Sequence, residues 1–337
     1  MTLCMMPLRP SISPLVVLVL ALSAAMLQAA DDPLPTWNTG PAKASILAFV
    51  GQVTKQGDPG FVPPAERIAV FDNDGTLWPE QPVYTQFLFG MARAKAVASA
   101  HPEWKDQEPF KSALAGDLKG LENTGVKGLV DLTAGSCAGM TVGEFDQLVT
   151  NWLAAARHPR FNRPYTECVY QPMLEVLAWL RANGFKTYIV SGGSLDVLRP
   201  WSERVYGVPP EQVIGSTVLT RFEMREGKPV LLRLAETEHM TDGTGKALAI
   251  QRVIGRQPIA AFGNSDGDLP MLQWTASGSG RRFCLYVHHT DAQREWAYDR
   301  NARTGRLDKG LDEARAHGWT IVDMKKDWKR VFAFEQE

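Results

Sequence analysis

Two carboxylates one residue apart stand where an apolar run of the chain ends. The run Ile68 to Phe71 is β-branched and aromatic, which favours a buried strand, and Asp72-Asn73-Asp74-Gly75-Thr76 follows it directly. Carboxylates in such a place are costly to desolvate unless they are paired, protonated or bound to a metal ion. Gly75 permits a tight turn, and Thr76 can hydrogen-bond near it. A solvated acidic turn is the alternative interpretation, because Asp, Asn and Gly are ordinary loop residues.

Three further polar clusters follow strands or open helices later in the chain. Each has a plain structural interpretation when it stands alone: a turn or helix cap, a solvated lysine, or loop carboxylates. Their order favours a shared site, since ligands of open α/β sheets bind outside the carboxyl ends of the strands. The clusters are Ser191-Gly192-Gly193 after the apolar run Phe185 to Val190, Lys246 in the first turn of a helix expected over Gly245 to Ile254, and Asn264, Asp266 and Asp268 after the strand Ile259 to Phe262.

Alternating strand and helix patterns predict an α/β fold, a Rossmann-like parallel sheet flanked by helices. The interval between Phe71 and Phe185 lacks a convincing strand. Its apolar positions have helical spacing over Tyr84 to Ser99, Pro109 to Leu118 and Val142 to Ala156. We therefore expect an inserted α-helical cap at 79–167, with the catalytic core formed by 31–78 and 168–337. The turn signal Glu226-Gly227-Lys228 predicts a hairpin between Val213 to Thr217 and Val230 to Leu234.

Residues 1–30 have the composition of a secretory signal peptide. Arg9 is their only charged side chain, an apolar run spans Leu15 to Leu22, and small residues lead to Ala29 and Ala30. Cleavage after either alanine would give a periplasmic or secreted protein. An uncleaved anchor is the alternative, but the apolar segment is short for a helix that spans a bilayer. We expect no stable membrane insertion after cleavage.

The rest of the chain carries no block of basic residues, so we expect no nucleic-acid partner. Cys137, Cys168 and Cys284 remain outside the signal, and their spacing matches neither a zinc site nor a redox pair. A disulfide between Cys137 and Cys168, with Cys284 free, is one of the pairings that the sequence admits.

The four clusters in this order resemble the motifs of the haloacid dehalogenase-like (HAD) hydrolases, in their phosphoserine phosphatase-like branch with a helical (C1-type) cap. The resemblance implies a Mg²⁺-dependent phosphatase that forms a phospho-aspartyl intermediate on a small phosphorylated substrate. In the implied roles Asp72 is the nucleophile and a metal ligand. Asp74 is the general acid and base and a ligand through its carbonyl. Ser191 binds a phosphate oxygen, Lys246 fixes a positive charge, and Gly192 contributes to substrate binding.

The fourth motif departs from the common family pattern. Many relatives begin it with Gly-Asp and have a second Asp four residues later, whereas here Asn264 holds the first place and Asp268 the second. An amide oxygen can still bind Mg²⁺, with one negative charge fewer. Asp266, which the common pattern does not include, is a candidate for the missing carboxylate. The direct ligand among these three residues stays open at this point.

Residues after the first motif bear on the substrate. Trp78, Glu80 and Tyr84 follow it closely, so Glu80 is a candidate for binding a cationic head group such as an amine. Packing of the two rings at the cap hinge is the alternative. Two other functions are alternatives to a phosphatase. One is a dehalogenase, which needs neither Asp74 as an acid nor Mg²⁺, and the other is a non-catalytic periplasmic protein that binds ligands on the same fold.

Overall fold

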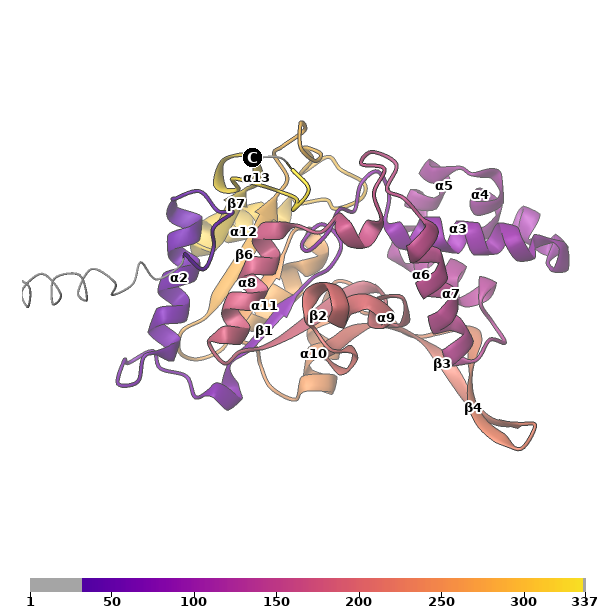
Figure 1. The fold of residues 1–337 in the computed structure, drawn as a ribbon, viewed down its shortest axis with the longest axis horizontal. Coiled ribbons are helices and arrows are strands. Elements are labelled where there is room, and N and C mark those ends of the chain that lie inside the picture. Colours follow the sequence, from indigo (N-terminus) through magenta and orange to yellow (C-terminus); the bar gives the residue numbers. More distant parts are fainter. Residues whose placement is uncertain (1–31, 336–337) are drawn as a thin grey trace, which may run out of the picture. The chain divides into compact units, whose positions relative to one another are not determined.

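A computed structural model describes residues 32–335, and the predicted signal peptide with its cleavage site lies outside them. Seven strands form one sheet in the order β4-β3-β2-β1-β5-β6-β7 (Figure 1). All neighbours are parallel except β3 and β4, which pair antiparallel. The predicted α/β fold class is confirmed. The strands are β1 (Ile68–Phe71), β2 (Lys186–Ser194), β3 (Val213–Arg225), β4 (Lys228–His239), β5 (Ala260–Gly263), β6 (Phe283–His288) and β7 (Thr320–Asp323).

Helices cover both faces of this sheet because its central strands are apolar on both sides. Along β1, Ala69 and Phe71 belong to one buried cluster, whereas Ile68 and Val70 belong to another. The first cluster includes side chains of α2 (Pro41–Thr54), α8 (Gln171–Ala182) and α9 (Leu195–Tyr206), and the second includes those of α10 (Thr244–Ile254), α11 (Leu269–Ala276) and α12 (Lys309–His317). A short helix, α13 (Met324–Asp327), follows β7.

The strand order reverses at β1, since β2 and β3 lie on one side of it and β5 and β6 on the other. This switch point opens a crevice at the carboxyl ends of β1, β2 and β5, the usual ligand site of such sheets. The backbone N–H of Asp72 continues the ladder to β5 by donating to the Phe262 carbonyl at 2.9 Å. Asp72 therefore stands at the edge of the crevice on a fixed backbone.

The helical segment between β1 and β2 has a hydrophobic cluster of its own, which includes Phe87, Trp104 and Leu132. Two of its helices, α5 and α6, were not predicted, and Gly120, Gly125 and Gly128 explain why, because glycine has low helix propensity. The domain boundaries at 79 and 167 stay a prediction. The helices of the segment are α3 (Thr85–Val97), α4 (Phe110–Ala115), α5 (Leu118–Asn123), α6 (Gly125–Ser136) and α7 (Val142–Ala155).

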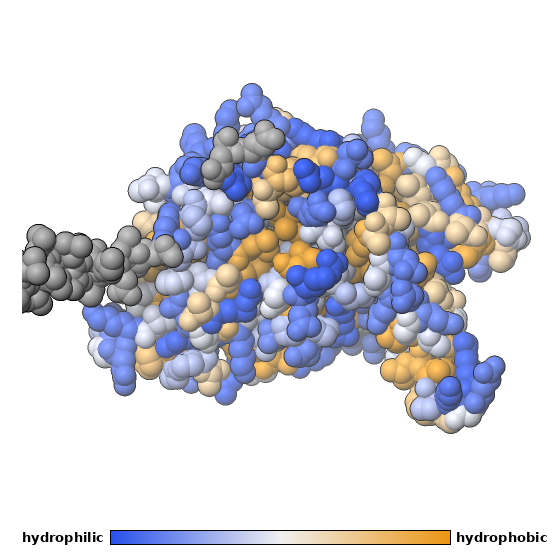
Figure 2. Space-filling view, viewed as in Figure 1, coloured by the Kyte–Doolittle hydropathy of each residue, from blue (hydrophilic) through white to orange (hydrophobic). Residues whose placement is uncertain are grey.

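The predicted hairpin is present and is longer than expected. Its strands pair as far as Arg225 and Lys228, and the arm extends away from the helices around it (Figure 1). Phe222, Met224 and Leu231 are exposed on it, and Figure 2 shows hydrophobic residues gathered on this arm. Its outer half alternates apolar and charged residues, so an apolar run alone does not reveal its length.

The cysteines are free in the structure: Cys137, Cys168 and Cys284 are all buried as thiols. The Cys168 thiol donates to the Pro164 carbonyl at 3.4 Å, and the Cys137 thiol lies 3.8 Å from the Ser136 hydroxyl. The disulfide between Cys137 and Cys168 is thus not formed. None of the helices within residues 32–335 combines the length and the apolar character needed to cross a membrane.

Candidate active site

Asp72 and Lys246 form the centre of the crevice. Lys246 lies in the first turn of α10, is only 2% exposed, and contacts Asp72 Oδ1 through its ammonium group. The same ammonium donates to Asp268 Oδ1 at 2.6 Å and to the Val190 carbonyl at 2.8 Å. An ammonium group has three donors, so these acceptors use all of them. Burial alone would lower the pKa of Lys246, but the charges of Asp268 and Asp72 raise it above the ordinary lysine value. Lys246 is therefore a fixed cation.

Asp74 faces the same cavity from the turn after β1. Its Oδ1 accepts a hydrogen bond from the Trp78 indole N–H at 2.8 Å. Burial raises the pKa of Asp74, and the Trp78 hydrogen bond lowers it only in part. A carboxyl group with a raised pKa holds its proton at higher pH, which a general acid requires. Asp72 also has a raised pKa, because burial and the charge of Asp268 outweigh the nearby Lys246.

Side chains from three other parts of the chain pack against the turn between Asp72 and Asp74. Gly75 has a φ of +79°, and a Cβ there would lie 2.1 Å from Asn264 Nδ2. The carbonyl of Gly75 lies 2.8 Å from Nε2 of His289, whose Nδ1 lies 3.0 Å from a Glu295 oxygen. Tyr206 donates its hydroxyl to Asn73 Oδ1 at 3.0 Å. Only glycine fits at position 75 without displacing Asn264.

The last residues of β2, where its pairing with β3 is irregular, bring Gly192 and Gly193 to the cavity wall. Ser191 is fully buried, and its hydroxyl oxygen accepts from the Gly193 N–H at 3.1 Å, so it shapes this end of the strand. Gln86 of α3 accepts from the Ser194 N–H at 3.0 Å, which ties the end of β2 to the helical segment. The role of Ser191 toward phosphate stays a prediction.

Asn264, Asp266 and Asp268 of the fourth cluster each contact a different part of the protein. Asp268 uses both oxygens inside the protein, Oδ1 for Lys246 and Oδ2 for the backbone N–H groups of Asn264 and Ser265 at 2.9 and 3.0 Å. Asp266 accepts from the backbone N–H groups of 308–310, at the start of α12, at 2.8 to 3.3 Å. Asn264 Oδ1 instead accepts from the Thr76 hydroxyl at 3.1 Å, and this hydroxyl also lies 3.5 Å from Asp72 Oδ2.

These contacts distinguish the three predicted ligands of the fourth motif. Asp266 caps α12, where backbone donors satisfy its oxygens. Asp268 holds Lys246 and the backbone at Asn264 and Ser265. Asn264 shares the Thr76 hydroxyl with Asp72. Which of the three binds a metal ion stays a prediction.

Glu80 lines the same cavity and is held by two neutral donors. It is 1% exposed, and its Oε1 accepts from Asn264 Nδ2 at 2.6 Å and from the Tyr298 hydroxyl at 2.8 Å. One carboxylate oxygen is thus engaged with Asn264 and Tyr298. The role of Glu80 toward a cationic head group stays a prediction.

The donor set suits a divalent cation that prefers oxygen. Five carboxylates line the cavity, and Lys246 is the one Lys or Arg among its described lining residues. Such an excess of acidic groups needs a countercharge or protons. The five are Asp72, Asp74, Glu80, Asp242 and Asp268. Within residues 32–335 no group of three or more His, Cys, Asp or Glu side chains is arranged to hold a metal ion. A metal would therefore depend on the Asn264 amide oxygen and a backbone carbonyl besides Asp72, a combination that Mg²⁺ accepts with water and phosphate.

The cavity at this site has a volume of about 30 Å³. The sequence interpretation missed three features of its lining: Val126 and Leu129 from the unpredicted α6, and Asp242 before α10. Asp242 stands four residues before Lys246, a proximity that could have identified it.

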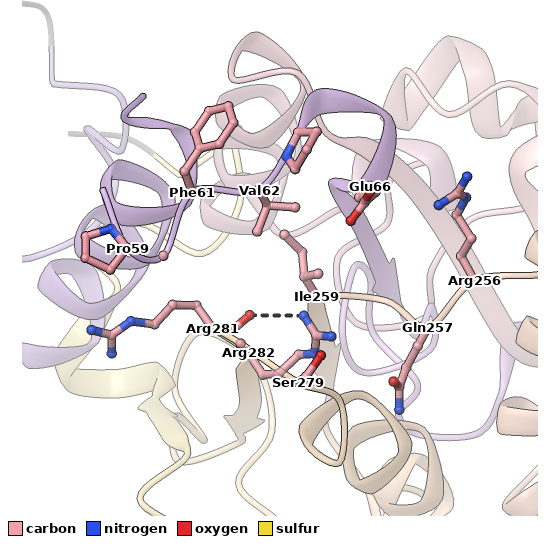
Figure 3. A pocket seen from close by; sticks show the side chains of 13 residues that line it. Pro59, Phe61, Val62, Glu66, Arg256, Gln257, Ile259, Ser279, Arg281 and Arg282 are labelled. Atoms are coloured by element: carbon pink, nitrogen blue, oxygen red, sulfur yellow. Dashed lines mark hydrogen bonds between the residues drawn. The ribbon is translucent and has the colours of Figure 1, made fainter. Parts of the chain in front are cut away.

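A larger hollow of about 710 Å³ lies elsewhere in the protein. Its wall is formed by residues that precede β1, β5 and β6, among them Glu66, Ile259 and Arg282 (Figure 3). It contains none of the predicted site residues.

Comparisons with known proteins agree with this geometry. The sequence model of the haloacid dehalogenase-like hydrolase family matches residues 69–273, which is more than half of the chain. The chain therefore belongs to this family. The predicted membership and the prediction of a hydrolase are confirmed, and the family supports a phosphatase-type function. No curated protein matches the sequence.

Solved structures share the fold at low sequence identity. A protein of unknown function from Anaerococcus prevotii is 13% identical with a TM-score of 0.55, and the match covers 86% of this chain and 94% of that one. One from Bordetella pertussis, also of unknown function, is 18% identical with a TM-score of 0.50, over 77% and 99%. A phosphoserine phosphohydrolase-like protein from Francisella tularensis is 12% identical with a TM-score of 0.38, over 74% and 99%. The first two likenesses concern the fold alone, and nothing is inferred from the third.

Proposed function

We propose that this protein is a Mg²⁺-dependent phosphatase that hydrolyses small phosphomonoesters through a phospho-aspartyl intermediate. One observation carries the proposal: Lys246 bridges Asp72 and Asp268 at the strand switch point, while Asp74 lines the same cavity. This arrangement combines a carboxylate nucleophile, a fixed cation and a second carboxyl group that can carry a proton.

In the first step an oxygen of Asp72 attacks phosphorus, and the bond from phosphorus to the ester oxygen breaks. Asp74 gives its proton to the departing alkoxide, which leaves as an alcohol. The negative charge on the phosphoryl oxygens lies near Lys246 and the backbone of Gly192 and Gly193. Asp72 is then a mixed anhydride with phosphate.

In the second step Asp74, now a carboxylate, takes a proton from water, and the water oxygen attacks phosphorus. The bond between phosphorus and Asp72 breaks, which restores both carboxyl groups and releases inorganic phosphate. Lys246 stays charged throughout, since Asp268 holds it in place.

The residues that would hold Mg²⁺ are Asp72, the Asp74 carbonyl and Asn264. When bound, the ion would neutralise charge on the phosphoryl oxygens and on Asp72 as they approach each other. Thr76 contacts both Asp72 and Asn264, which keeps their oxygens on the same side of the turn.

The cavity lining bears on the substrate. A cavity of about 30 Å³ has room for two or three waters at roughly 10–15 Å³ each, so we expect its lining to open when a phosphomonoester binds. Lys246 is the only Lys or Arg among the described lining residues, whereas Asp242 is an exposed carboxylate there. We infer a preference for neutral or cationic leaving groups over anionic ones.

The composition of residues 1–30 supports a place in the periplasm or outside the cell. Fractionation of cells that express the full chain tests this location. Mature protein beginning at residue 30 or 31 is expected outside the cytoplasm.

The test of function is a phosphate-release screen over sugar phosphates, phosphoamino acids, nucleotides and phosphocholine, with Mg²⁺ or with EDTA. Release that needs Mg²⁺ and disappears in Asp72→Asn supports the proposal. Halide release from a haloacid without Mg²⁺ would favour a dehalogenase. Ligand binding with no turnover in any condition would favour the non-catalytic alternative.

A further inference from the structure

Among the described residues, Glu80 is a buried carboxylate with no basic partner. It lies just after the first motif, and it takes part in no ion pair among those found in residues 32–335. Its hydrogen-bond partners are the Asn264 amide and the Tyr298 hydroxyl, both neutral donors at 2.6 and 2.8 Å. A carboxylate buried in this way stays ionised only beside a cation and otherwise takes up a proton. A cation held next to Asn264 would keep it ionised.

Two glycine turns make room for this carboxylate. A Cβ at Gly75 would lie 2.5 Å from Glu80 Oε1, and a Cβ at Gly305 would lie 1.8 Å from the same oxygen. Both glycines have positive φ values, +79° and +71°. The chain therefore encloses Glu80 with backbone from two distant segments, which places it against Asn264 and fixes its direction.

The contact with Asn264 determines how that amide is oriented. Because Glu80 accepts from Nδ2, the Asn264 Oδ1 atom faces Thr76 and the side of Asp72. An amide whose N–H₂ is held by a carboxylate presents its oxygen as a stronger donor to a cation. The fourth motif thus keeps an oxygen ligand, although it lacks the carboxylate that many relatives have in this place.

We propose that Glu80 supplies, through Asn264, the negative charge that the fourth motif has lost. It is a positioning residue for the cation, and this inference rests on the proposed Mg²⁺ site. In this arrangement the carboxylate belongs to Glu80, in the segment after the first motif, and not to the first residue of the fourth motif. The number of negative charges around the cation is the same.

The test removes the carboxylate at position 80, introduces one at position 264, and measures the affinity of the protein for divalent cations. Mn²⁺ binding to the full protein is measured by electron paramagnetic resonance, and Mg²⁺ binding by calorimetry, without substrate. The variants are Glu80→Gln, Asn264→Asp and the double variant. Glu122→Gln is the matched control, because Glu122 of α5 accepts from the Thr304 hydroxyl at 3.1 Å and does not line the cavity.

Glu80→Gln is expected to weaken binding about 10- to 100-fold, as loss of a partner of a metal ligand does. The double variant, which returns a carboxylate to position 264, is expected to recover most of this loss. Glu122→Gln is expected to bind as the unaltered protein does. A loss of packing alone would not be repaired by Asn264→Asp, so the recovery separates charge from structure.

Two results would overturn the inference: equal affinity in Glu80→Gln and the unaltered protein, or a double variant that binds no better than Glu80→Gln. Absence of cation binding in the unaltered protein would instead remove the proposed Mg²⁺ function itself. If Glu80→Gln does not fold, the double variant still decides the question, since it must bind about as tightly as the unaltered protein.

Discussion

The Lys246 ammonium lies 2.6 Å from Asp268 Oδ1, in a contact that is almost wholly buried on both sides. In this pair Asp268 holds the Lys246 ammonium in place beside Asp72, the proposed nucleophile. The other oxygen of Asp268 accepts from the backbone N–H groups of Asn264 and Ser265, so Asp268 links Lys246 to the turn after β5.

Removing one member of this pair should be costly. Asp268→Ala leaves Lys246 with less countercharge in a buried place, so we expect a loss of about 3–5 kcal/mol in the free energy of unfolding. Urea denaturation measures it. Glu167→Ala, which breaks an exposed ion pair with Arg163, is the control and should cost about 1 kcal/mol or less. Similar losses in the two variants would contradict the structural role of Asp268.

Asp74 should matter most for poor leaving groups. Asp74→Asn removes the proton donor, so we expect kcat/KM, which reports the step in which the alcohol leaves, to fall about 10²- to 10⁴-fold with an alkyl phosphate. The loss should be much smaller with p-nitrophenyl phosphate, whose leaving group needs little protonation in the first step. Steady-state kinetics on both substrates check this. Equal losses would show that Asp74 does not act as the general acid.

Gly75 is predicted to accept no side chain. Gly75→Ala combines a positive φ with a Cβ that overlaps Asn264, so it should cost more than about 3 kcal/mol in stability. Gly57→Ala is the matched control, because Gly57 has a φ of +86° with nothing within 4 Å of its Cβ position. It should show only the backbone cost, about 1–2 kcal/mol. Thermal and urea unfolding compare the two, and equal effects would contradict the proposed packing around Asn264.

His158 should make the protein sensitive to mild acid. Its Nδ1 accepts from the Arg160 N–H at 3.2 Å, and burial lowers the pKa of His158 to about 4 in the folded state. The unfolded chain binds a proton near pH 6.5, so the folded state loses up to about 3 kcal/mol as the pH falls from 6.5 to 4. Unfolding free energies across this range test it. His158→Gln should lack this part of the pH dependence, and an unchanged slope would exclude His158 as its source.

The sequence predicted those features that a short stretch of residues determines. The strand Ile68–Phe71 has the predicted bounds, and the clusters at Asp72, Gly192 and Lys246 meet at one cavity because they follow or precede parallel strands. Local pattern could not reveal the partners of Asp266 or Glu80. The partners of Asp266 lie 42 to 44 positions away in the chain and those of Glu80 lie 184 and 218 positions away, and only the folded backbone brings them together.

Residues of the same type therefore received different roles from tertiary contacts. Asp266 and Asp268 are two residues apart and equally acidic, yet one caps α12 and the other holds Lys246. The cavity wall from α6 was missed for a related reason, because packing against α3 outweighs the low helix propensity of its glycines.

The most direct test of the central claim is to trap the phosphorylated residue. The protein is mixed with excess p-nitrophenyl phosphate and Mg²⁺, quenched in acid and reduced with borohydride, which converts an acyl phosphate to an alcohol. Peptide mass spectrometry should then find homoserine at position 72 and aspartate at position 74. Phosphate release with unmodified Asp72, or a modification at Asp74 instead, would contradict the assignment of Asp72 as the nucleophile.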